Sequence, residues 1–197
     1  PTPMDTTQPV DTTIKTDSAA LLGGPPMPAI DSTPLTIANP ADSVSSAQYA
    51  IFYTSANSRA QAIADERLKA QPALAVAPVI LDGAEWFQVY IGASADKAGA
   101  EMLLSKLRAA QLISGGNITS VPFAFRLEGG VAAANVSNRI TSYDTKGVMA
   151  YAMMQTNGTA TLYTGAYQAP FQAKRLADSL RALGITPVLA YRTGRAF

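Results

Sequence analysis

The chain has 197 residues but no histidine and no cysteine, and charged residues make up only 15% of it. Without histidine there is no imidazole to act as a general base near neutral pH or to activate a serine. Without cysteine there is no thiolate, no disulfide and no cysteine-ligated metal centre. Only carboxylate, lysine and tyrosine chemistry remains. We therefore expect a binding protein rather than an enzyme, with neither a metal nor another cofactor.

Charged residues are scarce, and the lysines and arginines are dispersed. Soluble domains usually contain about 25% charged residues, whereas here 15 basic and 14 acidic residues give a net charge of +1. Binding of nucleic acid requires clustered lysine and arginine to displace counterions, and no such cluster is present. Hydrophobic residues at 48% are enough for a folded core. The composition suits contact with protein or neutral glycans and argues against nucleic acid.

No hydrophobic run reaches the length of about 20 residues that a membrane-spanning helix needs. The run 74–81 is interrupted by Pro78. The chain starts at Pro1 with neither a basic nor a hydrophobic leader, so we expect that a leader has been removed and that the protein lies outside the cytoplasm. The absence of cysteine is compatible with a bacterial envelope, as it is with the cytosol. The expected location is periplasmic, soluble or peripheral to the membrane.

Residues 1–47 differ in composition from the rest. They contain eight of the 13 prolines and eight threonines, and five Asp against one Lys give them a net charge of −4. Such a segment lacks the apolar periodicity needed for a core of its own. We expect an extended tail, which either folds back on the basic remainder of the chain or binds a partner.

From residue 49 the pattern predicts the element order β-α-β-β-α-β. Asp82-Gly83 is a strong hairpin signal, Asp96 has the position of a helix N-cap, and Gly115-Gly116 ends that second helix. The predicted strands are 49–54, 74–81, 86–91 and 118–127, and the first predicted helix is 58–70.

A second, weaker copy of the same unit follows. With an offset of 73 positions, Gly165 matches Gly92, Leu176 matches Leu103 and Leu180 matches Leu107, which indicates an internal repeat. The copy is predicted to have a helix near 135–146, strands 148–155, 159–164 and 186–192, and a turn at Asn157-Gly158. It shows no obvious first strand, so either the strand at 121–127 serves both units or the copy is reduced.

The run Glu85 to Gly92 (EWFQVYIG) and the following Lys97-Ala-Gly-Ala-Glu101 and Leu103–Leu107 resemble the SPOR (sporulation-related repeat) domains of bacterial envelope proteins. The resemblance covers about 48–127, with a degenerate copy at 128–197. It implies an α+β protein of two SPOR-like, ferredoxin-type units in tandem, each with an antiparallel sheet and two helices on one face. The Pro/Thr-rich tail at 1–47 precedes them.

SPOR domains bind peptidoglycan glycan strands on the exposed face of the sheet, so the resemblance implies a site there. Strand alternation directs Trp86, Gln88 and Tyr90 to the helix-free face, together with Phe52 of the first strand. Trp86 could also be a half-buried core residue. The candidate contacts to protein or glycan are Phe52, Ser55, Trp86, Gln88, Tyr90 and Tyr163.

Two functions follow as expectations. In the first, the protein is a non-catalytic accessory subunit that docks on a larger envelope or membrane complex through its sheet face and tail. In the second, it binds peptidoglycan as the family does. Phe52 and Gln88 stand where the family usually has Gln and Arg, which favours the first. A catalytic carboxylate pair at Asp82 and Glu85 is disfavoured, because both residues flank a hairpin turn.

Overall fold

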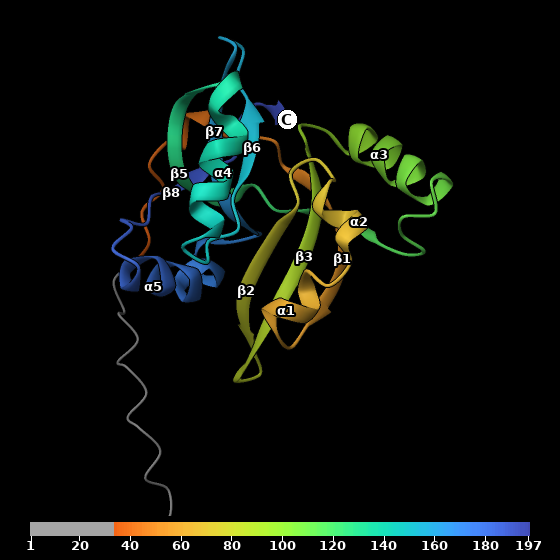
Figure 1. Ribbon diagram of the computed structural model, residues 1–197, viewed down its shortest axis with the longest axis horizontal. Helices are drawn as coiled ribbons and strands as arrows, with labels where there is room; N and C mark the ends of the chain where they lie inside the picture. Colours follow the sequence, from red (N-terminus) through yellow and green to blue (C-terminus); the bar gives the residue numbers. More distant parts are fainter. Residues whose placement is uncertain (1–33) are drawn as a thin grey trace, which may run out of the picture. The chain divides into compact units, whose positions relative to one another are not determined.

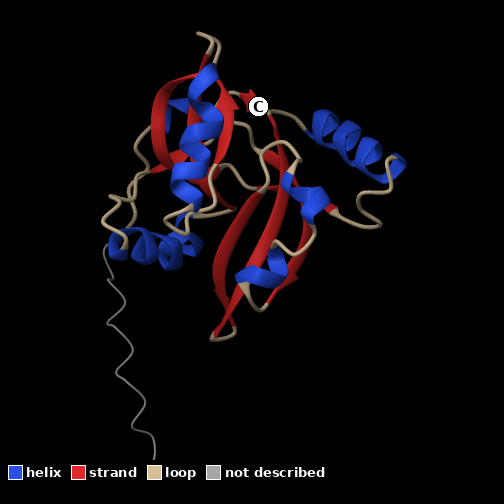
Figure 2. Ribbon diagram, viewed as in Figure 1, coloured by secondary structure: helices blue, strands red, loops and turns tan. Residues whose placement is uncertain are grey.

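The computed structural model describes residues 34–197 and has two antiparallel sheets with helices, which confirms the predicted α+β class (Figure 2). The first sheet contains β1 (Tyr49–Ala56), β2 (Ala75–Leu81), β3 (Ala84–Ser94) and β4 (Asn117–Ser120). The second contains β5 (Phe123–Ala132), β6 (Tyr151–Met154), β7 (Thr159–Tyr167), β8 (Leu189–Tyr191) and β9 (Arg195–Ala196). The α-helices are α1 (Arg59–Ala62), α2 (Glu66–Lys69), α3 (Lys97–Ala109), α4 (Val136–Asp144) and α5 (Lys174–Ala182), and the 3₁₀ turns are η1 (Pro40–Ser43), η2 (Ala133–Asn135) and η3 (Pro170–Ala173).

Both sheets have the same strand order. The first runs β2-β3-β1-β4 and the second β8-β5-β7-β6, with β9 added at the edge beside β6 (Figure 1). Counted within each unit, this is the order 2-3-1-4 of the ferredoxin-like split βαβ arrangement. Each half of the described chain is therefore a complete β-α-β-β-α-β unit.

The predicted strand 118–127 is wrong, because the chain changes sheets in the middle of it. β4 ends at Ser120 and β5 begins at Phe123. Between them Val121 N donates to Gln48 O at 2.7 Å, while Pro122 has no N–H for a strand ladder. The sequence allowed residues 121–127 to serve both units. The structure shows that β5 is the first strand of the second unit.

The repeat seen in the sequence has a structural counterpart in β3 and β7. Gly92 and Gly165 have φ values of +83° and +71°, which side-chain-bearing residues rarely adopt. A Cβ on Gly92 would collide with the side chain of Leu103, and one on Gly165 with that of Leu176. In each unit a helix leucine, eleven residues after the glycine, packs against the glycine backbone where a side chain would otherwise lie.

Replacing Gly92 with alanine should lower the free energy of unfolding by about 2–3 kcal/mol, from backbone strain plus overlap with Leu103. The matched control is Gly83→Ala, since Gly83 has φ +78° but open space where the Cβ would lie. The control should lose only about 1 kcal/mol. Urea unfolding curves measure both losses. Equal losses would show that overlap with Leu103 adds nothing to the cost of the Gly92 substitution.

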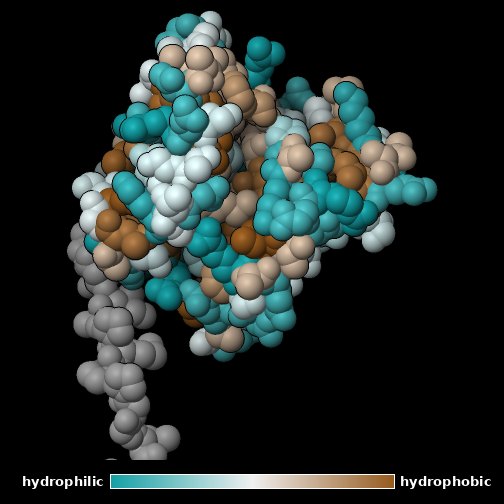
Figure 3. Space-filling model, viewed as in Figure 1, coloured by the Kyte–Doolittle hydropathy of each residue, from teal (hydrophilic) through white to brown (hydrophobic). Residues whose placement is uncertain are grey.

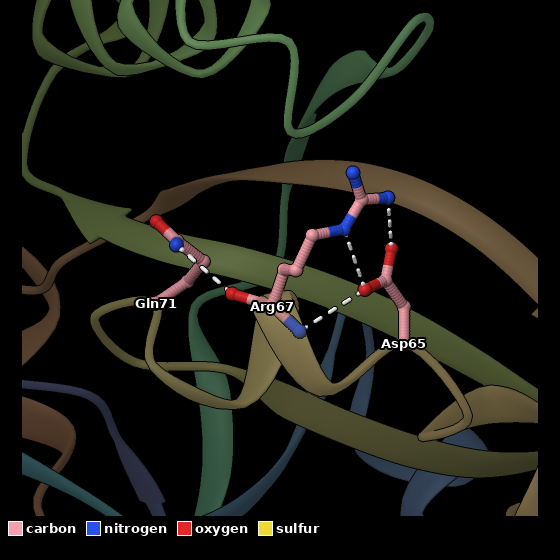
Figure 4. A network of polar contacts seen from close by, with 3 residues as sticks. All are labelled: Asp65, Arg67 and Gln71. Carbon is pink, nitrogen blue, oxygen red and sulfur yellow. Dashed lines mark hydrogen bonds and ion pairs between the residues drawn. The ribbon is translucent and has the colours of Figure 1, made fainter.

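The predicted helix 58–70 is two short helices, α1 and α2. The first helix ends at Ala62, and Asp65 caps the N-terminus of the second. Its Oδ1 accepts from the backbone N of Arg67 at 3.0 Å (Figure 4). The Arg67 guanidinium also donates to Asp65, with its Nη2 2.7 Å from Oδ2, and this contact lowers the pKa of the carboxyl group. An aspartate in the N-cap position favours the start of a new helix over continuation of the preceding one.

Residues 34–47, which we assigned to the tail, pack along β8 at the edge of the second sheet. Ala38 N donates to Leu189 O at 2.8 Å, and Asn39 Oδ1 accepts from Tyr191 N at 2.7 Å. This segment therefore belongs to the folded unit. The remainder of the predicted tail, 1–33, lies outside the described residues.

The core has three parts. Helices α1 to α3 cover one face of the first sheet, where Ile51, Val89 and Ile91 meet Leu104 and Leu107. Helix α4 covers one face of the second sheet over a smaller cluster. The largest cluster lies between the two sheets and extends to α5, which contributes Ala177 and Leu180. It contains Ala75, Ala77, Val79 and Tyr90 from the first unit, and Phe123, Phe125, Tyr151, Met153, Tyr163 and Tyr167 from the second. Helix α5 therefore packs in the cluster shared by the two units and contacts β2, whereas α4 packs over the smaller cluster; the two helices of the second unit do not share one cluster as the resemblance implied.

Candidate binding surface

The alternation predicted for β3 agrees with the register of the sheet. Phe52 of β1 pairs with Tyr90 and Ser55 pairs with Gln88, while Trp86 pairs with Val79 of β2. Directly paired residues lie on the same side of a sheet. Five of the six candidate residues are therefore grouped on β1 and β3, and Tyr163 lies on β7 in the other sheet.

This face is largely covered by the second unit. Tyr90 is 1% exposed, its ring centroid lies 5.7 Å from that of Phe52, and its hydroxyl donates to Gln88 Oε1 at 2.9 Å. Tyr163 is also 1% exposed, and its ring stacks with that of Tyr151 at 6.0 Å. Phe52 and Gln88 are half-buried. Tyr90 and Tyr163 are core residues in this arrangement, and only Ser55 and Trp86 are exposed.

A polar cluster is buried where the two sheets meet. Arg192 is completely buried and takes part in none of the ion pairs found in 34–197. Burial raises the pKa of Tyr90 and of Tyr151 to about 12, and the nearby charge of Arg192 opposes the rise in both. Burial also raises the pKa of Tyr167 well above its usual value, with Tyr151 and Tyr90 adding to the effect. The three phenols therefore stay protonated at neutral pH.

The tip of the β2–β3 hairpin exposes large apolar side chains. Ile80 is 53% exposed, Leu81 41% and Trp86 36%. We name these three residues the hairpin-tip patch; by the strand register Leu81 and Trp86 lie on one face of the hairpin and Ile80 on the other. The turn between them is formed by Asp82 (φ +51°) and Gly83 (φ +78°), as the Asp-Gly signal predicted. Elsewhere on the face drawn in Figure 3, hydrophobic side chains appear as separate areas between hydrophilic ones. A tryptophan flanked by exposed aliphatic residues is typical of a protein-docking element.

Of the two acidic residues at the hairpin, Glu85 has a structural partner. Glu85 Oε1 lies 2.6 Å from Nε of Arg175 on α5, which links the hairpin of the first unit to the second. Glu128 pairs with Arg139 at 2.7 Å. Within 34–197, no three acidic side chains converge as metal ligands would. The Glu85–Arg175 ion pair therefore connects the two units.

The C-terminal arginines do not form a common basic surface. Arg192 is buried, Arg175 pairs with Glu85, and Arg181 pairs with Asp178 at 2.7 Å. These three arginines therefore form no common patch for an anionic partner.

A groove of about 650 Å³ lies between the α1–α2 region and the α4–β6 region, a volume in the range of small-molecule sites. Its polar lining includes Arg59, Lys69 and Asp144, and its apolar lining includes Ile140 and Phe197. Burial raises the pKa of Asp144, against the opposing charges of Arg59 and Lys69. Lys69 is already held by Glu66 at 2.7 Å, and Arg59 donates to Gly147 O. Both cations are therefore engaged in structural contacts.

The sequence analysis missed Tyr151, Tyr167 and Arg192 as members of a buried cluster, and Ile80 and Leu81 as exposed. One signal was present: β2 and β7 are nearly continuous in apolar and small residues rather than alternating. Such runs are typical of strands covered on both faces. They could have indicated that the helix-free faces are not open.

Comparison of the chain with protein-family models, with curated proteins and with solved structures finds no match. None of the helices within 34–197 combines the length and apolar character that a membrane crossing requires. Function is therefore inferred from the geometry of these residues.

Proposed function

We propose that the chain is a non-catalytic structural subunit of the bacterial envelope, located in the periplasm, that docks on a larger protein complex. The observation that carries this proposal is the exposed hairpin-tip patch, beside two sheets that pack against each other within 34–197. The absence of histidine and cysteine from the sequence points the same way, since the chain lacks the usual groups for catalysis at neutral pH.

The mutual covering of the two sheets supports docking through an edge rather than through a sheet face. The candidate residues Tyr90 and Tyr163 are occupied in holding the two units together. The hairpin is braced by the Glu85–Arg175 pair and projects its apolar tip beyond that contact. Leu81 and Trp86 share one face of the hairpin and are partly exposed, so a partner that covers them gains the free energy of burying their remaining apolar surface.

Site-directed cross-linking tests this proposal, because the chain has no native cysteine to interfere. Ala84→Cys places a thiol in the exposed hairpin, and the control Ser142→Cys places one on the exposed surface of α4. In native envelopes, a thiol-linked photoreactive probe at 84 should yield one discrete high-mass adduct, lost on Trp86→Ala. Equal labelling from both positions, or none from 84, would contradict docking through the hairpin.

Peptidoglycan binding is the second candidate, and the strand order of both units favours it because it agrees with that implied by the SPOR resemblance. A sedimentation assay with purified sacculi separates the two functions. A structural subunit should stay in the supernatant. Strong retention that is abolished by Trp86→Ala or Gln88→Ala would replace the docking proposal with glycan binding.

The N-terminal segment is the other proposed docking element. Since 34–47 pack on β8, the deletion that tests it removes only 1–33. If the segment contributes to docking, the truncated protein should co-purify with the complex less efficiently while unfolding at the same temperature. Unchanged association would leave docking to the hairpin alone.

A further inference from the structure

The groove of about 650 Å³ is lined by residues of both units. Ser137, Ile140 and Asp144 are spaced three and four residues apart in α4, which places them on one face of that helix, and all three line the groove. The segment that follows α2 lines it from the first unit. Phe197, which is 52% exposed, also borders it, and its backbone N donates to Ala152 O at 3.3 Å. Elements remote in sequence therefore bring polar and apolar side chains to one open groove.

Charged side chains of both signs line this groove without contacting each other. Among the described residues these are Arg59 of α1, Lys69 of α2 and Asp144 of α4. Asp144 belongs to none of the ion pairs found within 34–197. Arg59 and Lys69 nevertheless both act electrostatically on its carboxyl group. The two cations are therefore close enough to influence the carboxylate but too far away to pair with it directly.

The carboxylate of Asp144 lacks a donor. Its oxygens accept no hydrogen bond from the residues 34–197, although an ionised carboxyl group has two acceptor oxygens. Burial raises the pKa of this group, against the opposing effect of the two cations. The walls of the groove thus remove part of its water without supplying a partner. A positively charged donor placed in the groove would satisfy it.

The two cations retain donors for a second partner. Arg59 uses Nη1 to donate to Gly147 O, while a guanidinium has further N–H groups on Nε and Nη2. Lys69 pairs with Glu66 at 2.7 Å, but these side chains are 42% and 79% exposed, and such exposed pairs contribute little to stability. A carboxylate in the groove can therefore accept from both cations.

We propose that the groove binds a zwitterionic peptide of about two or three residues, a size that suits its volume. The terminal ammonium group of the peptide donates to Asp144, and its terminal carboxylate accepts from Arg59 and Lys69. An apolar side chain of the peptide packs against Ile140 and Phe197. A ligand of one sign only would pair with one part of the groove and be repelled by the other, so the ligand carries both charges.

Titration of the isotopically labelled full chain with the dipeptide leucyl-leucine, followed by nuclear magnetic resonance, tests the ligand and its location. Binding should be weak, with a Kd roughly between micromolar and millimolar. The amide signals that shift should be those of 69–74 and 137–144. No shifts up to about 10 mM dipeptide, or shifts confined to other residues, would overturn the proposal.

Two blocked forms of the same dipeptide test the two charges separately. N-acetyl-leucyl-leucine has no ammonium group, and leucyl-leucine amide has no carboxylate. Each should bind about tenfold or more weakly than the free dipeptide, because a charged group of the groove then stays unpaired. Equal affinities of the three compounds would show that the groove takes apolar ligands regardless of charge, which contradicts a zwitterion site.

Asp144→Asn identifies the partner of the ammonium group. It should weaken binding of leucyl-leucine about tenfold but leave binding of the acetylated form unchanged, because that form makes no ion pair with Asp144. The matched control is Asp82→Asn, which changes an exposed carboxyl group in the β2–β3 turn and should alter neither affinity. Equal effects of the two variants, or equal losses for the free and acetylated dipeptides, would overturn the proposal.

Lys69→Gln examines the carboxylate end in the same way. It should weaken binding of leucyl-leucine several-fold and leave binding of the amide form unchanged. The control Lys106→Gln changes an exposed lysine on α3 and should have no effect. Because Lys69 is itself exposed, both variants should unfold at the wild-type temperature. An unchanged affinity of Lys69→Gln for leucyl-leucine would contradict the assigned orientation of the peptide.

Discussion

Replacing Tyr90 with alanine should lower the free energy of unfolding by about 3–5 kcal/mol, the usual cost of removing a large aromatic side chain from a core. The ring is 1% exposed, contacts Phe52 and packs against the second sheet. Removing it leaves a cavity at the junction of the two units and leaves Gln88 Oε1 without its donor. Urea unfolding followed by circular dichroism measures the loss.

The matched control is Trp86→Ala, four residues away on the same face of β3. Trp86 is 36% exposed at the hairpin tip, so its truncation should cost only about 1 kcal/mol. The two variants therefore distinguish a covered sheet face from an open one. If both cost the same small amount, Tyr90 is accessible in solution and the helix-free face is available to a partner or glycan.

Much of the fold could be predicted from local signals. Asp96 caps α3 by accepting from Gly99 N at 2.7 Å, and Asp82-Gly83 forms the β2–β3 turn. The helix predicted at 135–146 is α4, and the third strand 86–91 lies within β3. These features depend on residues close in sequence, where capping, turn chemistry and strand alternation act directly.

Features that depend on distant residues could not be predicted in this way. The change of sheets at Pro122 is set by contacts to Gln48 and Arg192, which lie far away in the sequence. The final predicted strand, 186–192, is shortened to β8 for the same reason, because Arg192 leaves the ladder to bond Pro122 and Ala47. Local propensity does not contain such information.

The candidate site shows the same division. Alternation correctly placed Phe52, Gln88 and Tyr90 on one face. Whether that face is open depends on how two units pack, and this is decided by the shape and apolar area of both sheets together. In an isolated unit these side chains would be exposed, as we expected. In the full chain the second unit packs over Tyr90 and buries it.

Alkaline pH should unfold the protein cooperatively between about pH 10.5 and 12. In the unfolded chain, tyrosines lose their protons near pH 10, whereas burial raises the pKa of Tyr90 and Tyr151 to about 12 in the folded state. The unfolded state then binds fewer protons, so stability is complete below about pH 10 and falls as the pH rises. Two pKa units correspond to about 3 kcal/mol for each tyrosine. Together they approach the total stability of a typical domain.

Circular dichroism and the ultraviolet absorbance of tyrosinate, recorded on the same samples, measure this transition. Tyr151→Phe removes one of the raised groups and should move the alkaline midpoint to higher pH. The control Tyr53→Phe, a half-exposed position on β1, should not. Smooth titration of all eight tyrosines near pH 10 with an intact dichroism signal would mean that the phenols between the sheets are reached by solvent without unfolding. The junction between the two units would then be open rather than closed.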